Sequence, residues 1–320
     1  MGIKIGIGRM QISHGGGTGV DWSSYWATLI SATVENAAPT HVVLTGLAPR
    51  ADVTADLFTI AGFTISSASW TGAVFTLVVS RPVLVFDEDL TITFVKSGET
   101  GTVTNNVAND GNTVGWYDLD TDTITKSVAE LISKWADKLG SGNDLLQASD
   151  IQKPLYTQDY VFFEENTRFV ENVAIPALTQ PTFIYMVVKQ NNWTAGNGIF
   201  DGSALFNGAC YQTVATPTIA IRAGAASAVA HNTDLAIGSW GIVRILFNGA
   251  GSKIQVNASA ATTGNPGAND MGGIRLGSMG GYTVQSCIRE AIFRANADDA
   301  TTEAAIYNYL ENKHAFFLTP

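Results

Sequence analysis

The sequence has little charge, no cluster of basic residues and no long apolar run, and each absence argues against a class of protein. Only 14% of the 320 residues are charged while 46% are hydrophobic, which is too little charge for a disordered chain and enough apolar material for a sizeable core. The 18 basic residues are scattered and the net charge is −10, which argues against a nucleic-acid partner because phosphate binding needs clustered Lys and Arg. No long apolar run indicates membrane insertion.

Cysteine is almost missing, with only Cys210 and Cys287. Two cysteines cannot build a disulfide framework, and their apolar, strand-like surroundings predict buried thiols. One disulfide between them stays open, although it is not expected if the protein matures in a cytosol. The start, "MGIKIGIGRMQISHGGGTG", has no positive region followed by an apolar region, so we expect no classical secretory leader.

Glycine, by contrast, is plentiful at 32 residues, and Thr, Val and Ala are frequent, which is typical of short strands joined by tight turns. Between residues 37 and 107, runs such as "THVVLTGL", "AVFTLVVS" and "LTITFVKSG" predict a small antiparallel sandwich of immunoglobulin-like type. Residues 108–113 are predicted to be a linker, because Asn, Asp and Gly dominate this joint.

The segment 1–36 carries three large aromatic residues in a short stretch: Trp22, Tyr25 and Trp26. Exposed aromatic side chains favour aggregation, so a free tail rarely carries three of them. We therefore expect these side chains to dock on the first domain or on a partner subunit. The segment 1–36 as a whole is predicted to anchor the chain.

Residues 114–320 again consist mainly of strand-like runs, including "TFIYMVVKQ", "GIVRILFNG" and "SCIREAIFRA". A helix is predicted over "DDATTEAAIYNYLENKHAFF", with Asp299 as its cap and Glu303 in its first turn, where a carboxylate suits the helix dipole. Helical spacing gives this helix one stripe able to lie on a sandwich edge, formed by Ile306, Tyr309, Leu310 and Lys313.

The stretch "WADKLGSGNDLLQ" resembles the entry into the laminin-G-like, concanavalin A-like jelly rolls. That family has the pattern W-x-D-x-x-G-x-G-x-x-L-x-Q, followed by a proline and a V-x-F strand. The matching positions are Trp135, Asp137, Gly140, Gly142, Leu145, Gln147, Pro154, Val161 and Phe163. The closing run "IRLGS", the strand "SCIREAIFRA" and the terminal helix match as well. The resemblance implies an all-β jelly roll with a short C-terminal helix, and it says little about a ligand.

Within this resemblance, Trp135 is predicted to be a core or corner residue. Asp137 is predicted to cap the Gly-Ser-Gly turn by accepting backbone N–H bonds rather than to act as a catalytic acid, since no partner carboxylate is at hand. Glycoside hydrolases among such jelly rolls carry spaced carboxylates on one strand. Here Glu164 and Glu165 are adjacent and would point to opposite faces, and Glu171 lies beyond that spacing. We therefore predict a protein that is not an enzyme, with a glycan hydrolase of the same fold as the alternative.

Metal binding finds little support in the sequence. The four histidines are far apart and unpaired, which argues against a zinc site: His14, His41, His231 and His314. The run "DLDTDT" has Thr123 and Ala129 where an EF-hand loop needs glycine and glutamate, so a solvated turn is predicted. No cofactor is expected, and calcium stays an alternative without a motif.

Glycan recognition is the remaining candidate chemistry. Shallow sugar sites combine aromatic stacking with hydrogen bonds from Asn, Asp and Gly. Three turns offer such groups, and the candidate ligand-binding residues are Asn191, Asn192, Trp193, Asn197, Asn269, Asp270 and Tyr282. The alternative is that these are ordinary hairpin turns rich in Asn and Gly.

The first sandwich also resembles the bacterial Ig-like modules of surface and phage proteins. Paired with the jelly roll, it implies a non-enzymatic bacteriophage virion protein: a capsid decoration, head fibre or tail-associated protein. We expect Trp22, Tyr25 and Trp26 to contact other virion proteins and the jelly roll to bind host or environmental glycans. A homo-oligomer, made in the host cytoplasm and located in the virion, is expected. A bacterial surface adhesin is a further alternative, which would need an export or wall-anchoring signal.

Overall fold

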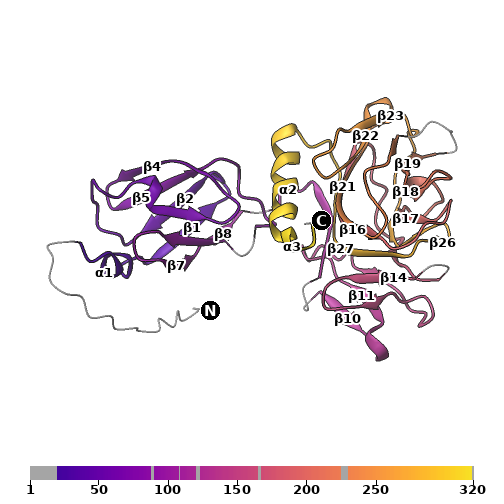
Figure 1. Ribbon diagram of the computed structural model, residues 1–320, viewed down its shortest axis with the longest axis horizontal. Helices are drawn as coiled ribbons and strands as arrows, with labels where there is room; N and C mark the ends of the chain where they lie inside the picture. The colour runs from indigo at the N-terminus through magenta and orange to yellow at the C-terminus, as the bar shows by residue number, and fades with distance from the viewer. Residues whose placement is uncertain are drawn as a thin grey trace. The chain divides into compact units, whose positions relative to one another are not determined.

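The computed structural model describes residues 20–87, 90–107, 109–119, 123–164, 167–224 and 230–318 (Figure 1). The chain divides into two compact units. The first comprises the described residues of Met1–Ser80 and Asp89–Asn105, and the second those of Arg81–Glu88 and Asn106–Pro320. Both are built from mainly antiparallel sheets, so the predicted all-β class is confirmed. No helix in the described ranges is both long and apolar enough to cross a membrane.

The first unit is the Ig-like sandwich, with a five-stranded sheet in the order β4-β5-β2-β1-β8 and a three-stranded sheet in the order β3-β6-β7. Burial alternates along β2 and β5, as expected for strands with one face on a core. The rings of Phe58 and Phe75, one from each sheet, lie 5.3 Å apart between centroids. The strands are β1 (Ser31–Glu35), β2 (His41–Thr45), β3 (Phe58–Ile60), β4 (Ile65–Thr71), β5 (Val74–Val79), β6 (Thr91–Phe94), β7 (Glu99–Thr102) and β8 (Thr104–Asn106).

Helix α1 (Trp22–Trp26) carries the aromatic triplet and packs within this first unit. The ring of Trp26 stacks on Phe94 at 5.4 Å with an interplanar angle of 2°, and the Tyr25 hydroxyl donates to the carbonyl of Ala48 at 2.7 Å. Tyr25 and Trp26 are buried and Trp22 is half-buried. Of the two locations expected for the triplet, docking on the first domain is therefore observed.

The predicted boundary after residue 36 needs correction, because it falls between β1 and β2 of one sheet. Residues 20–36 are part of the Ig-like unit rather than a separate anchoring segment, since β1 supplies a paired strand and α1 supplies core rings. Residues 1–19, with the glycine-rich start and His14, lie outside the described residues.

The second unit is a larger sandwich, the jelly roll. Its eight-stranded sheet has the order β13-β14-β27-β16-β21-β22-β23, with β9 also paired to β27, and its eleven-stranded sheet runs β10-β11-β12-β15-β24-β17-β18-β19-β20, with β25 and β26 attached. The strands of the first sheet are β9 (Thr113–Asp118), β13 (Leu155–Tyr156), β14 (Val161–Phe163), β16 (Thr182–Gln190), β21 (Trp240–Phe247), β22 (Ser252–Val256), β23 (Thr262–Gly264) and β27 (Ser286–Arg294). Those of the second are β10 (Ile124–Lys126), β11 (Ile132–Trp135), β12 (Leu145–Leu146), β15 (Val170–Asn172), β17 (Gly198–Asp201), β18 (Asn207–Gln212), β19 (Ile219–Ala223), β20 (His231–Asn232), β24 (Ile274–Leu276), β25 (Ser278–Met279) and β26 (Tyr282–Thr283).

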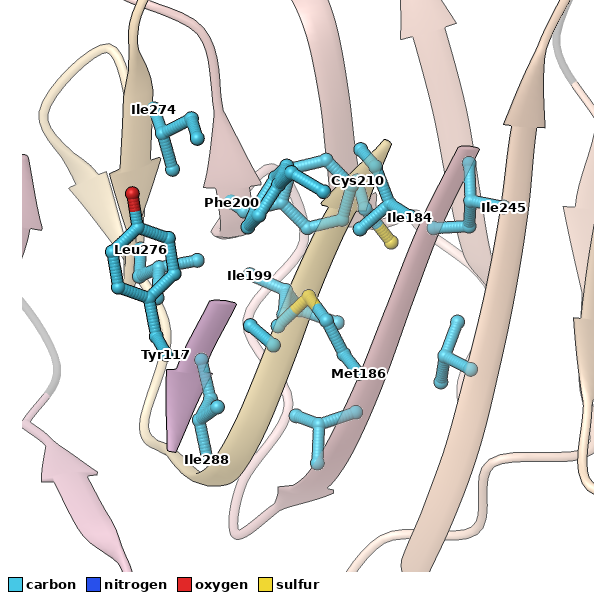
Figure 2. Close-up of a cluster of buried hydrophobic side chains, with 14 of the residues drawn as sticks. Tyr117, Ile184, Met186, Ile199, Phe200, Cys210, Ile245, Ile274, Leu276 and Ile288 are labelled. Atoms are coloured by element: carbon cyan, nitrogen blue, oxygen red, sulfur yellow. The ribbon is translucent and has the colours of Figure 1, made fainter. Parts of the chain in front are cut away.

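The main core lies between these two sheets (Figure 2). Ile184 and Met186 of β16 contribute from one sheet, and Phe200 and Cys210 from the other. The predicted burial of the cysteines is confirmed, since Cys210 and Cys287 are both buried and free. Strand β16 is buried on both faces, so hydrophobic residues run through it without alternation.

A third layer explains why both faces of that strand are buried. Helices α2 (Ala300–Lys313) and α3 (Ala315–Leu318) cover the outer face of the eight-stranded sheet (Figure 1). The predicted cap is confirmed, because Asp299 accepts from the backbone N–H of Thr302 at 2.7 Å. Ile306 and Leu310 pack on the face of the sheet, rather than on an edge as expected.

Residues 81–87 also belong to this layer, which corrects the predicted Ig-like range of 37–107. The ring of Phe86 meets Trp116 of β9 edge-on, with 4.9 Å between centroids. Arg81 and Asp87 form a buried ion pair at 2.8 Å that closes this short segment on itself.

Candidate functional site

The corner that resembles the jelly-roll family is structural, as predicted. Trp135 is fully buried, and its indole N–H donates to the carbonyl of Asp118 at 2.7 Å. Asp137 accepts from the backbone N–H groups of Ser141 at 3.2 Å and Trp116 at 2.9 Å, so it caps the turn and ties it to β9. The turn residues Gly140 and Gly142 have φ of 69° and 85°, a backbone conformation that favours glycine.

The predicted glycan residues of the loop between β16 and β17 are held by internal hydrogen bonds. Trp193 is half-buried against the core, and its indole N–H donates to the carbonyl of Thr213 at 3.1 Å. The side chain of Gln212 donates to the carbonyl of Asn192 at 2.8 Å, and the backbone N–H of Gln212 donates to the buried Asn197 at 2.9 Å. These bonds fix the loop over the end of β18.

Tyr282 joins this loop at the same end of the sandwich. Strand β26 pairs in parallel with β17 through Gly198 and Thr283, so Tyr282 stands beside the end of the loop. At the loop's beginning, the backbone N–H of Asn191 donates to the carbonyl of Gln285 at 2.9 Å. Tyr282 is 59% exposed, so its ring is open to solvent. Five of the predicted residues therefore form one loop-end cluster: Asn191, Asn192, Trp193, Asn197 and Tyr282.

The other two predicted residues lie elsewhere. The side chain of Asn269 donates to Asn207 at 2.9 Å, and Asp270 accepts from the backbone N–H of Gln180 at 3.2 Å. Asn207 begins β18 and Gln212, which holds the loop-end cluster, ends it. At about 3.3 Å per residue, five steps along the strand separate these sites by about 17 Å. Asn269 and Asp270 do not belong to the loop-end cluster, and the predicted set divides between two ends of the sheet.

Between α2 and the outer face of the eight-stranded sheet lies a charge cluster (Asp118, Lys138, Glu290, Lys313 and His314), named here the buried charge cluster after its buried members Asp118, Glu290 and His314; Lys138 is half-buried and Lys313 of α2 is partly exposed. Asp118 and Glu290 are cross-strand partners in β9 and β27. The ammonium of Lys313 lies 2.5 Å from the Asp118 carboxylate and 3.2 Å from that of Glu290, and Lys138 reaches Asp118 at 3.1 Å. The prediction of a solvated turn is wrong for Asp118, which is 2% exposed; residues 120–122 of that run lie outside the described ranges.

Glu290 is the most completely bonded member. It accepts from the Trp116 indole at 2.7 Å and from the Tyr309 hydroxyl at 2.8 Å. His314 Nε2 lies 2.8 Å from the second carboxylate oxygen, and His314 Nδ1 accepts from Nε of Arg289 at 3.2 Å. Since a guanidinium has no acceptor, Nδ1 must be the unprotonated nitrogen, and Nε2 then donates to Glu290.

Burial and neighbouring charges shift the two carboxyl groups in opposite directions. Burial alone would raise the pKa of Glu290, but Lys313, His314 and Trp116 outweigh it and lower the pKa to about 2. Burial and then the charge of Glu290 raise the pKa of Asp118, against the lysines. Acid–base chemistry on a glycan requires two carboxyl groups whose pKa values are shifted apart, as they are here. Glu290, however, is 0% exposed under the helix. In this state the pair docks α2 and has no access to a substrate.

Next to the buried charge cluster is an aromatic–cation platform (Tyr160, Lys189, Trp240, Arg289 and Phe317), whose side chains are all half-buried. The Lys189 ammonium lies 5.5 Å from the Tyr160 ring and 5.2 Å from the Trp240 ring. The Arg289 guanidinium lies 3.5 Å from the Phe317 ring centroid. A β-bulge between Val187 and Val188 leaves Arg289 outside the pairing with β16, which turns its side chain toward the outer face.

Sequence reasoning missed both of these clusters. Lys313 offered a signal, because it continues the apolar stripe of α2 and therefore needs a buried negative partner. No comparable signal marked Glu290, since its partners are up to 174 residues away in the chain. For the metal prediction, no group of three His, Cys, Asp or Glu suited to a metal ion occurs in the described ranges.

The chain matches no protein-family model and no curated protein. Among solved structures it is similar to Trypanosoma rangeli sialidase in complex with sialic acid, at 11% identity and a TM-score of 0.45, covering 85% of this chain and 45% of that one. It is also similar to an arabinofuranosidase complexed with arabinofuranosyl-alpha-1,2-xylobiose, at 15% identity and a TM-score of 0.41, covering 57% and 51%. A botulinum neurotoxin type C structure, described as depending on two ganglioside molecules for cell entry, matches at 14% identity and a TM-score of 0.45, covering 62% and 51%. The chain thus spans about half the length of these structures, and their activities do not transfer to it.

Proposed function

We propose that the protein is a non-enzymatic bacteriophage virion accessory protein whose jelly roll binds glycans. The observation that supports glycan binding is the loop-end cluster, where Tyr282 is exposed beside a loop fixed by Gln212 and Gln285. A rigid loop with amide groups next to an open aromatic ring suits a shallow sugar site, because little ordering entropy is lost on binding.

Glycan-array binding by the full chain tests this proposal. Selective binding is expected, with Tyr282→Ala and Trp193→Ala each weakening it, since stacked aromatic rings supply most of the contact area. Asn269→Ala is the matched control, because it removes a predicted residue from the other end of the sheet and should leave binding unchanged. Absence of binding to any glycan by a folded chain would count against the proposal.

The virion setting rests on the resemblance of the two modules to phage proteins, and it has its own test. Antibody detection in gradient-purified particles from a culture expressing the chain should show it co-sedimenting with the particles. A protein that stays in the soluble fraction would contradict this part of the proposal.

A glycan hydrolase is the second candidate, favoured by the facing carboxylates of Asp118 and Glu290. It would require α2 to move away, because the helix seals the pair. Incubation of the chain with the array glycans that it binds, followed by product analysis, separates the candidates. Products made by the natural chain and absent with Glu290→Gln would favour the hydrolase over the binding protein.

A further inference from the structure

We propose that the aromatic–cation platform extends the loop-end cluster onto the outer face of the sheet and binds the acidic group of a carboxylated or sulfated glycan. This inference rests on the proposed function, since it names the glycan class for the same end of the jelly roll.

The platform and the loop-end cluster are joined through Asn191. Lys189 and Asn191 are two residues apart, and Lys189 pairs across the sheet with Cys287. The Asn191 side chain donates to the Cys287 sulfur at 3.2 Å, so it lies on the same outer face as Lys189. One glycan can therefore contact the loop with one sugar unit and the platform with the next sugar unit.

The platform supplies the ring surfaces that a sugar needs. Tyr160 and Trp240 come from the two flanks of the strand order β14-β27-β16-β21, and their centroids lie 5.9 Å apart. The ring of Phe317 of α3 lies 6.0 Å from the Trp240 ring between centroids. Three rings from three separate elements thus form a continuous, half-exposed surface for the apolar face of a pyranose.

Charge selects an acidic glycan. Lys189 and Arg289 place two cations on this surface in a chain whose net charge is −10. The carboxylates of Asp118 and Glu290 act on Arg289, but Lys138 and Lys313 are paired with them and balance their two negative charges. Arg289 donates to His314 and to the carbonyl of Asp159, which uses two of the five N–H donors of a guanidinium. The facing acidic residue is the exposed Asp159, which leaves a net positive patch.

The test compares matched pairs of glycans, each as the neutral form and the carboxylated or sulfated form, against the full chain at low and high NaCl. We expect the acidic form to bind more tightly and to lose that advantage at high salt, because exposed charges are screened. Lys189→Gln should reduce binding of the acidic form about fivefold, the scale of one exposed charge contact, and leave the neutral form unchanged.

Two variants make the outcomes distinct. Lys96→Gln removes an exposed lysine from the first unit and should change nothing. Tyr282→Ala should weaken both forms alike, because it acts at the loop-end cluster. Equal binding of acidic and neutral forms, or an acidic preference that survives Lys189→Gln, would overturn the platform while leaving the proposed function intact. No binding to either form would overturn both.

Discussion

The two faces of the eight-stranded sheet are built by different means. The inner face meets the second sheet through apolar side chains such as Ile184 and Met186 (Figure 2). The outer face carries Tyr185 and Val187 from the same strand, but beside them it buries the carboxyl groups of Asp118 and Glu290. Apolar packing depends mainly on volume, whereas a buried carboxylate depends on each of its partners. The outer face should therefore be the less tolerant of substitution.

Removing the central carboxylate should have the largest effect. Glu290→Ala removes the buried acceptor that Trp116, Tyr309 and His314 share, and breaking such a network costs about 3–5 kcal/mol of unfolding free energy. Urea unfolding, followed through the transition of the second unit, measures this loss of unfolding free energy. Ile292→Val, on the same face of the same strand, is the matched control at about 0.5–1.5 kcal/mol. Equal losses for the two variants would contradict the claim that the carboxylate network, rather than apolar packing, makes the outer face sensitive.

The pH dependence of stability should follow from the lowered pKa of Glu290. Its pKa is about 2 in the folded chain against an ordinary 4.5, so the stabilisation is complete above about pH 4.5 and disappears as the pH falls toward 2. The shift corresponds to about 3 kcal/mol, as an order of magnitude. Glu290→Gln should flatten this acid limb in unfolding experiments carried out at successive pH values.

Asp118 should act with the opposite sign, because its folded pKa is raised. A raised pKa means that the folded chain binds the proton more tightly than the unfolded chain. Protonation of Asp118 therefore stabilises the folded chain as the pH falls through the folded pKa. Asp118→Asn removes that gain and should steepen the acid limb. Flattening in both variants would argue against opposite pKa shifts in the pair.

A smaller effect is expected on the inner face. Ile184→Val removes one methylene from an apolar site that has no polar group to strand, so the expected loss is about 0.5–1.5 kcal/mol. Equilibrium unfolding should show this loss with no change in the acid limb. A pH-dependent change would show that the two faces are coupled through β16.

The smallest effect should come from an exposed ion pair. Lys126 and Glu130 lie 2.6 Å apart, but their side chains are 38% and 57% exposed. Lys126→Gln should therefore cost less than about 1 kcal/mol, because water and salt screen the pair. A loss as large as that of Glu290→Ala would mean that burial does not determine how much an ion pair contributes to the unfolding free energy.

Some of these features could be predicted from the sequence. The corner from Trp135 to Gln147 was predicted correctly, including the role of Asp137, because its turn chemistry is local. The helix start at Asp299 follows from the same kind of short-range rule. The seven predicted glycan residues do not form one site, because Asn269 and Asp270 are of the same polar types as the loop-end residues but lie at another place.

The sequence by itself determined the all-β class, the corner and the capped terminal helix, because turn residues, strand alternation and helix caps act over a few positions. Only the tertiary structure decided that residues 20–36 complete the first sandwich, that α2 lies on a sheet face, and that Asp118, Glu290 and Lys313 meet. The reason is physical: buried charges and platform rings are brought together by strand register between segments far apart in the chain, and no local pattern encodes that pairing.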